Sequence, residues 1–310
     1  MVEGKPMRVA AIDCGTNSLR LLIADIDGEK LREVHRDMRI VRLGQGVDQN
    51  KAFAPEAIER TLVATREFAD LIRTKGATRV RFCATSATRD ATNRDIFIDG
   101  VQNILGISPE VIAGSEEAAL SFLGATKELG QELAPFLVVD IGGGSTEFVL
   151  GSRSVDSAHS VNIGCVRMSE RHFTAQPPTI DQIANAIIDI DAAILDAATW
   201  VDFKAAQTLI AVAGTATTVA AAALGLPLYD RYSIHLSRIS AQKVQEVAAM
   251  FAGMSRKDIS ALGYMHPGRV DVITSGALVL SRVMALTGAS EFLASESDIL
   301  DGIAWGLAEI

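Results

Sequence analysis

Two stretches decide the fold: AIDCGTNSLRLLI at residues 11–23 and VVDIGGGSTEFVL at residues 138–150. Each consists of an apolar run, an aspartate, a turn of small residues and a second apolar run. An offset of 127 residues aligns them without a gap, so that Asp13 matches Asp140, Gly15 matches Gly142 and Ser18 matches Ser145. Apolar runs joined by a tight turn containing Gly or Asn are typical of paired antiparallel strands. The sequence therefore predicts two copies of one strand–turn–strand unit.

Around these two units, runs with strand character alternate with runs of helical periodicity. Strands are predicted near residues 30–42, 78–84, 110–112, 154–161, 209–213 and 291–294. Helices are predicted at 93–105, 115–129, 179–198, 240–254, 268–286 and 297–308, with another opening at Pro55. This alternation indicates an α/β layered architecture. Pro135 precedes the second copy, which places a domain boundary near residue 130.

Composition excludes several classes of protein. The 310 residues include 29 Lys and Arg against 38 Asp and Glu, a net charge of −9. This acidic balance opposes non-specific binding to nucleic acid. The longest uncharged stretch, 205–229, is interrupted by Gly and Pro, and the first apolar run is too short for a signal peptide, so no membrane partner is expected. The three cysteines form no C-x-x-C pair, which suits a reducing compartment, and we expect a cytoplasmic protein.

The turn at Gly142–Ser145 suits an anion. Glycine tolerates the positive φ angles that let successive backbone N–H groups converge on one ligand. A turn of this kind behind a carboxylate predicts a site for a phosphate and a divalent cation, with Mg²⁺ favoured by oxygen ligands. The alternative is a pair of ordinary hairpin turns.

Three further segments have both a functional and a structural interpretation. Glu116 and Glu117 follow a predicted helix cap at Ser115, where acidic residues also offset the helix dipole. Arg89 lies in a predicted loop rich in hydroxyls, which suits an anion site or a solvated surface. The segment 214–218, GTATT, opens a predicted helix and is consistent with a simple cap. Phosphate-loop and zinc-protease motifs are absent from the sequence.

Seven segments, read in chain order, resemble the successive motifs of the exopolyphosphatase / guanosine pentaphosphate phosphohydrolase family, the Ppx/GppA phosphatases. They are AIDCGTNSLRLLIADI, ATSATRDATN, VIAGSEEAALSFLG, VVDIGGGSTEFVL, NIGCVRMSER, VAGTATTVAA and HPGRVDVITSGALVL. They cover nearly the whole chain, from residue 11 to residue 280. The resemblance implies two actin-like domains of the ribonuclease H-like superfold shared with sugar kinases and Hsp70, with an active-site cleft between them. It assigns residues 1–129 and a returning C-terminal helix, 297–310, to the first domain and residues 130–296 to the second.

The resemblance also implies a role for each motif residue. Glu117 would be the general base that activates water. Asp140 and Glu147 would hold Mg²⁺, or Mn²⁺ in its place, with Asp13 acting through a water. The phosphate-binding set implied by the family comprises Asn17, Ser18, Arg89, Gly142, Gly143, Gly144 and Ser145, with Arg20 and Arg269 as weaker candidates.

The implied activity is release of terminal phosphate from inorganic polyphosphate. The alternatives are hydrolysis of the 5′-phosphate of guanosine pentaphosphate, a kinase of the same superfold, and a non-catalytic sensor of either ligand. The Glu117 position favours water over a second substrate, and the complete set of Glu117, Asp140 and Glu147 opposes the sensor. The family also suggests a homodimer and closure of the domains on substrate. Longer relatives add helical domains that extend the polyphosphate groove, so the short chain puts high processivity in doubt.

Overall fold

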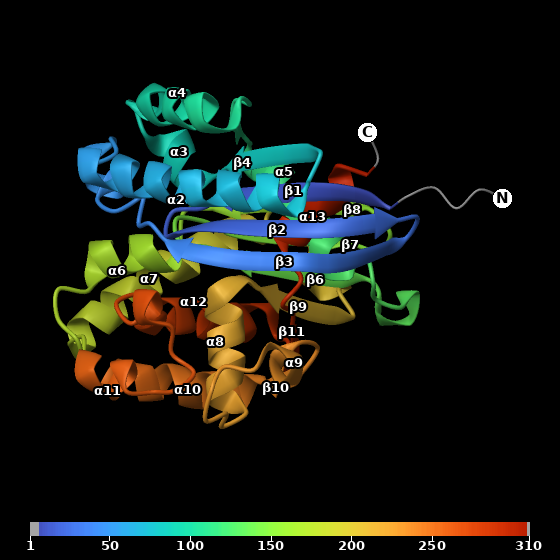
Figure 1. The fold of residues 1–310 in the computed structure, drawn as a ribbon. Coiled ribbons are helices and arrows are strands. Elements are labelled where there is room, and N and C mark those ends of the chain that lie inside the picture. The colour runs from blue at the N-terminus through green and yellow to red at the C-terminus, as the bar shows by residue number, and fades with distance from the viewer. Residues whose placement is uncertain (1–5, 309–310) are drawn as a thin grey trace. The chain divides into compact units, whose positions relative to one another are not determined.

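The computed structural model describes residues 6–308, which divide by their contacts into two compact units (Figure 1). The first unit contains the chain up to Gly124 and the C-terminal segment from Ile299. The second unit is the continuous segment Ala125–Asp298. The boundaries between the two units thus fall at residues 124/125 and 298/299. The boundaries predicted from the sequence are 129/130 and 296/297.

The first unit is a five-stranded sheet with its helices. Its strands are β1 (Met7–Cys14), β2 (Ser18–Asp27), β3 (Lys30–Ile40), β4 (Arg79–Ala84) and β5 (Glu110–Val111). Its helices are α1 (Val47–Asn50), α2 (Pro55–Lys75), α3 (Ser86–Asp90), α4 (Arg94–Leu105), α5 (Gly114–Thr126) and α13 (Ile299–Gly306). The strand order is β3-β2-β1-β4-β5. The neighbours β1 and β2, and β2 and β3, are antiparallel, whereas β4 is parallel to β1 and β5 is parallel to β4.

Both faces of this sheet are covered, as the side-chain alternation of β1 shows. Ala10 and Ile12 belong to a buried cluster with residues of α2 and α4. Val9 and Ala11 point to the opposite face, into a cluster with residues of α5 and α13. Because successive side chains of a strand point to opposite faces, a central strand covered on both sides is apolar throughout.

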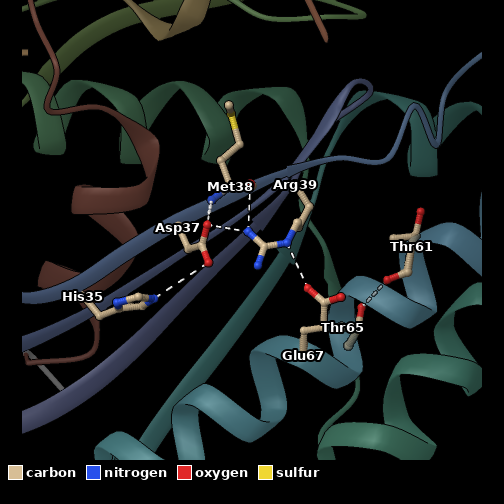
Figure 2. Close-up of polar contacts among 7 residues, drawn as sticks. All are labelled: His35, Asp37, Met38, Arg39, Thr61, Thr65 and Glu67. Atoms are coloured by element: carbon tan, nitrogen blue, oxygen red, sulfur yellow. Dashed lines mark hydrogen bonds and ion pairs between the residues drawn. The ribbon is translucent and has the colours of Figure 1, made fainter. Parts of the chain in front are cut away.

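A polar network fixes β3 against α2 (Figure 2). The Arg39 guanidinium donates from Nε to Glu67 of α2 at 2.9 Å and also pairs with Asp37 of its own strand. It lies 5.7 Å from the ring centroid of Phe68, which is a cation–π contact. His35 Nε2 lies 3.8 Å from Asp37 on the same strand. One arginine therefore joins the outer strand to the long helix.

The second unit repeats the first sheet and extends it. Its strands are β6 (Phe136–Ile141), β7 (Thr146–Gly151), β8 (Val155–Val161), β9 (Thr208–Val212), β10 (Arg238–Ser240) and β11 (Glu291–Ala294). Its α-helices are α6 (Cys165–His172), α7 (Ile180–Ala197), α8 (Ala213–Ala223), α9 (Arg231–Ile234), α10 (Ala241–Gly253), α11 (Arg256–Ser260) and α12 (Ile273–Thr287). Short 3₁₀ turns lie at Gln131–Leu133, Phe203–Ala205 and Pro267–Arg269. The strand order is β10-β11-β9-β6-β7-β8.

The order β8-β7-β6-β9-β11 has the same strand directions as β3-β2-β1-β4-β5. In each sheet three neighbouring strands form antiparallel pairs. The next two strands in the order run parallel to β1 in the first unit and to β6 in the second. The two strand–turn–strand units predicted from the 127-residue offset are β1–β2 and β6–β7. That prediction is confirmed.

Helix boundaries confirm some sequence signals and correct others. Thr179 and Gln182 form the predicted capping box at the start of α7, and Ser240 accepts from the Lys243 N–H at the start of α10. The predicted cap at Ser115 is wrong, because α5 begins at Gly114 and the Glu117 N–H bonds to the Ala113 carbonyl.

Two other predicted boundaries are also wrong. The helix predicted from residue 268 begins at Ile273, since a 3₁₀ turn precedes it. The helix predicted to reach Leu129 ends at Thr126. In both cases polar and glycine residues let a short irregular segment replace one turn of regular helix.

Candidate active site

The two turns are closed by the same backbone hydrogen bond. Gly15 donates to the Ser18 carbonyl at 3.0 Å, and Gly142 donates to the Ser145 carbonyl at 3.1 Å. Both turns lie where a central strand ends, β1 in the first unit and β6 in the second. Ligands of open α/β sheets commonly bind outside the carboxyl ends of such strands. The predicted phosphate turns are therefore in a suitable place in each unit.

In the second unit, the carbonyls of the turn all point toward the start of α6. The Gly142 carbonyl accepts from Cys165 N, the Gly143 carbonyl from Val166 N and Arg167 N, and the Gly144 carbonyl from Gly164 N, at 2.9–3.2 Å. A trans peptide holds its N–H opposite its C=O. The N–H groups of Gly143, Gly144 and Ser145 therefore point away from α6, and no described residue accepts from them. Three convergent donors are what an anion requires.

The reason for glycine here differs from the sequence prediction. None of Gly142, Gly143 and Gly144 has a left-handed φ, so the prediction of positive φ in this turn is wrong. Close packing matters instead. A Cβ on Gly164 would lie 2.3 Å from the Gly143 carbonyl carbon, and a Cβ on Gly142 would lie 3.2 Å from the Ser145 carbonyl oxygen.

Asp140 and Glu147 form the candidate metal site. They are directly opposite one another on β6 and β7, and both are buried. Ser160 Oγ of β8 donates to Glu147 Oε1 at 2.7 Å. No group of three or more His, Cys, Asp or Glu side chains that suits a metal is found among the described residues. Two carboxylates fit Mg²⁺, which commonly binds one or two carboxylates and completes its octahedron with water and substrate phosphate.

Asp13 is paired inside the first unit. Arg20 contacts Asp13 Oδ2 from Nη2 at 2.7 Å and from Nε at 2.9 Å, and the two residues are opposite one another on β1 and β2. This contact occupies the carboxylate that the family resemblance makes a metal ligand. It likewise occupies the guanidinium of a weak phosphate candidate, so Asp13 and Arg20 neutralise one another in this structure.

The first turn presents Asn17 and Ser18. The Asn17 carbonyl accepts from the N–H groups of Val41 and Arg42 at 3.0 and 2.9 Å, and the Thr16 carbonyl accepts from Gly44 at 2.9 Å. As in the second turn, these bonds send the following N–H groups, those of Asn17 and Ser18, to the opposite side. The backbone of residues 41–44 takes the place that α6 has in the second unit.

Glu117 lies in the first turn of α5, in contact with Arg89. The Arg89 Nη1 donates to Glu117 Oε2 at 2.6 Å and to the Ile112 carbonyl at 3.0 Å. The sequence placed Arg89 in a loop, which is wrong, since it belongs to the short helix α3. The structure thus brings together two predicted site residues, the base and a phosphate ligand.

Burial raises the pKa of Glu117, because the carboxylate is almost inaccessible to water. The Arg89 charge and hydrogen bond lower the pKa, and the negative charge of Asp13 raises it further. Glu116, its neighbour, is exposed and pairs with Arg81 at 2.6 Å. Only the second of the two glutamates therefore has an environment typical of a catalytic carboxylate.

Arg269 lies against the start of α8. Its Nη1 donates to Thr218 Oγ1 at 2.9 Å, and a Cβ on Gly214 would lie 2.4 Å from its Nη2. Glycine at position 214 therefore makes room for this arginine. Arg269 is also close enough to act electrostatically on the Cys165 thiol. Cys165 in turn donates from its N–H to the Gly142 carbonyl, so Arg269 lies near the second turn.

Two features of the second unit were not predicted. Arg167 is buried and donates from Nε to the Gly144 carbonyl at 2.7 Å. It lies within the motif NIGCVRMSER, which was noted without a role for the arginine. Tyr229 donates to Glu296 Oε1 at 2.5 Å, and burial raises the pKa of Tyr229 to about 12. No sequence signal indicated this pair.

The family model for the Ppx/GppA phosphatase family matches residues 22–306. The chain belongs to the Ppx/GppA phosphatase family. Exopolyphosphatase 2 of Mycobacterium tuberculosis is 48% identical to it, over 97% of this chain and 98% of the relative.

Solved structures agree with this family assignment. A crystal structure of an exopolyphosphatase-like protein has a TM-score of 0.95 at 46% identity and covers 99% of this chain and 98% of that one. The Aquifex aeolicus PPX-GPPA enzyme has a TM-score of 0.81 at 28% identity and covers 97% and 99%. The predicted actin-like two-domain α/β fold is confirmed. Among the described residues, none of the helices is both long and apolar enough for a membrane span.

Proposed function

We propose that this protein is an exopolyphosphatase that releases terminal orthophosphate from inorganic polyphosphate. The observation that carries the proposal is Glu117, a carboxylate buried in the first helical turn of α5 and held at 2.6 Å by Arg89. A base of raised pKa beside a cation suits attack by water on an anionic substrate. The high identity to a protein named exopolyphosphatase supports the same substrate.

In the proposed reaction Glu117 accepts a proton from the attacking water. The water oxygen bonds to the terminal phosphorus while the bridging P–O bond breaks, and the shortened polyphosphate leaves as an anion. The N–H groups of Gly143, Gly144 and Ser145 bind the phosphoryl oxygens on which charge is spread. The N–H groups of Asn17 and Ser18 are proposed to bind further phosphates of the chain.

Mg²⁺ is the proposed cofactor, and Asp140 with Glu147 would hold it. When bound, the ion supplies positive charge to the phosphate oxygens. The charge of this pair also explains why a metal would be needed. Two buried carboxylates would repel a polyanionic substrate unless a cation lies between them and the phosphates. Mn²⁺ has the same ligand preference and is expected to substitute.

Guanosine pentaphosphate is the second candidate substrate, because the Aquifex aeolicus relative carries both family names. A binding protein without activity is the other alternative. Purified protein is assayed with Mg²⁺ for phosphate release from polyphosphate, guanosine pentaphosphate and ATP in parallel. Fastest release from polyphosphate supports the proposal. Preference for guanosine pentaphosphate supports the second candidate, and binding without release supports a sensor.

Glu117→Gln is the decisive variant for the mechanism. We expect it to lower phosphate release by a factor of about 10² to 10⁴ and to leave tripolyphosphate binding measurable by calorimetry. Glu116→Gln is the matched control, because it removes a carboxylate from the same helical turn at an exposed position. Equal rates for the two variants would remove Glu117 from the role of base.

A homodimer through α7 is the proposed assembly. The outward face of this helix carries Ile188 and Leu195, 68% and 57% exposed, with Ile180, 85% exposed, at its start. Trp200, 64% exposed, follows its end. Several large apolar side chains exposed along one helix are typical of an interaction surface.

A second copy of the chain suits this surface, because most of the carboxylates of α7 have partners within the chain. Asp189 contacts Arg171 and His172, Asp191 contacts Arg282, and Asp196 contacts His159, whereas Asp181 is exposed at the start of the helix. Two chains of net charge −9 meet with less local repulsion where such charges have partners.

A two-fold axis at Ile188 makes the α7 face self-complementary. Antiparallel pairing would place Ala184 opposite Ala192 of the partner subunit, so the helix backbones could approach closely. Ile180 lies about 12 Å from Ile188 along the helix. In the antiparallel pair it would be opposite the C-terminal end of the partner's α7, which Trp200 follows. Each copy would thus supply both a protruding residue and an aromatic surface.

The proposed location is the cytoplasm. Cys14, Cys83 and Cys165 are buried and form no disulfide. Burial raises the pKa of all three thiols, so they are protonated and unreactive. Buried cysteines that are not paired with one another are consistent with a reducing compartment.

A further inference from the structure

Arg167 is a buried charge directly behind the second turn. It lies on α6, only 7% exposed, and its Nε donates to the Gly144 carbonyl at 2.7 Å. Burying a guanidinium is costly unless it is hydrogen-bonded and compensated, and an apolar side chain of similar length would fill the same space at lower cost. An arginine at this position therefore calls for an explanation beyond packing.

The Gly144 carbonyl receives two donors. Gly164 N donates at 3.2 Å and Arg167 Nε at 2.7 Å, so the shorter bond comes from the charged group. Charge-assisted hydrogen bonds are stronger than neutral ones and fix geometry more firmly. Arg167 thus has the larger part in setting the plane of the peptide between Gly144 and Ser145.

The same peptide carries the Ser145 N–H on its other side. Holding the carbonyl toward α6 aims this N–H away from α6, with those of Gly143 and Gly144. A positive charge at the carbonyl also polarises the peptide, which makes its N–H a better donor. The effect of Arg167 on a ligand is therefore transmitted through one peptide group.

The same turn connects the strands that carry the two carboxylates of the candidate metal site, so it lies between Asp140 and Glu147 in the chain. A turn that binds phosphate next to two negative charges benefits from a positive charge behind it.

We infer that Arg167 is a positioning residue for phosphate binding, which clamps the Gly144–Ser145 peptide so that the second turn presents its N–H groups to an anion. The inference rests on the proposed function, because it makes that turn the phosphate site. Arg167 itself need not touch the substrate. Its expected signature is a loss of phosphate affinity that exceeds any loss of stability.

The test compares Arg167→Met and Arg167→Lys with Arg171→Met. Arg171 lies one turn further along α6, where it is exposed and pairs with Asp189. Binding of inorganic pyrophosphate is measured by calorimetry, with urea unfolding as a check on folding. We expect Arg167→Met to weaken binding by a factor of about ten or more, as for loss of a charged hydrogen bond, with Lys partly restoring it. Arg171→Met should bind like the wild type.

A second measurement needs no variant that folds poorly. In the wild-type protein, pyrophosphate should shift the backbone amide resonances of Gly143, Gly144 and Ser145. Unshifted resonances, or a folded Arg167→Met protein with unchanged affinity, would overturn the inference. Pyrophosphate binding at the turn without polyphosphate hydrolysis would uphold the inference and reject the proposed function. Hydrolysis with unchanged affinity in Arg167→Met would do the reverse.

Discussion

Arg20 occupies in the first strand–turn–strand the register position that Glu147 occupies in the second. Arg20 is opposite Asp13 on β2 and β1, and Glu147 is opposite Asp140 on β7 and β6. The first pair is an ion pair with a contact of 2.7 Å, whereas the second places two carboxylates opposite one another. The same strand arrangement thus holds an ion pair in one unit and two opposed carboxylates, the proposed cation site, in the other.

Removal of Arg20 should destabilise the first unit. Arg20→Gln leaves the buried Asp13 carboxylate without its guanidinium, and we expect a loss of about 2 to 4 kcal/mol in the free energy of unfolding. Urea denaturation measures it. The double variant with Asp13→Asn should recover part of the loss, and Arg73→Gln, which breaks the exposed pair with Asp70, should cost less than about 1 kcal/mol. A double variant no more stable than Arg20→Gln would contradict the pairing.

The acid side of the pH–rate profile should depend on Arg89. Glu117 must be ionised to accept a proton, so activity falls as the pH falls through the raised pKa of this carboxylate. Arg89 lowers that pKa, and Arg89→Met should therefore move the acid limb of kcat/KM to higher pH. Arg94→Met, at an exposed position on α4, is the control. An acid limb that stays in place would show that another group controls it.

Loss of either carboxylate of the second pair should change the metal requirement. Asp140→Asn or Glu147→Gln should raise the Mg²⁺ concentration for half-maximal phosphate release by at least about tenfold. Direct titration with Mn²⁺ should show the same weakening without reference to turnover. Asp156→Asn alters an exposed carboxylate of β8 and should change neither value. Unaltered metal affinity in both site variants would exclude this pair as the metal site.

A charge on the α7 face should separate the proposed dimer. Light scattering of the wild type should give twice the chain mass of 32.9 kDa, and Ile188→Glu should give the single mass, because a charge is not tolerated at an apolar contact. Ile96→Glu places the same charge at another exposed isoleucine, on α4, and should remain dimeric. A wild type that is monomeric at micromolar concentration would reject the assembly.

The sequence predicted the repeated hairpins because local patterns define them. An apolar run, an aspartate and a turn recur at one offset, and strand pairing follows from a short connection. The roles of Arg20 and Arg89 were harder to predict, because both depend on which carboxylate each contacts. Both arginines are phosphate-binding candidates in the sequence. In the structure Arg20 contacts Asp13 and Arg89 contacts Glu117.

Close contacts between distant segments were also beyond the sequence. The need for glycine at 164 and 214 arises from a backbone carbonyl and an arginine that come from elsewhere in the chain. The Tyr229–Glu296 pair likewise joins residues 67 positions apart. Periodicity and turn chemistry carry no information on such pairs, whereas motif resemblance located the segments without their contacts.

The return of α13 to the first unit affects how the protein forms during translation. Helix α13 covers the face of the first sheet that Val9 and Ala11 share, and it packs so closely that a Cβ on Gly302 would lie 1.9 Å from the Leu120 carbonyl oxygen. Its residues follow the second unit in the chain, and the second unit is one uninterrupted segment. The first unit is therefore complete only after every residue of the second unit has been synthesised, which departs from the usual order in which the domain encoded first folds first.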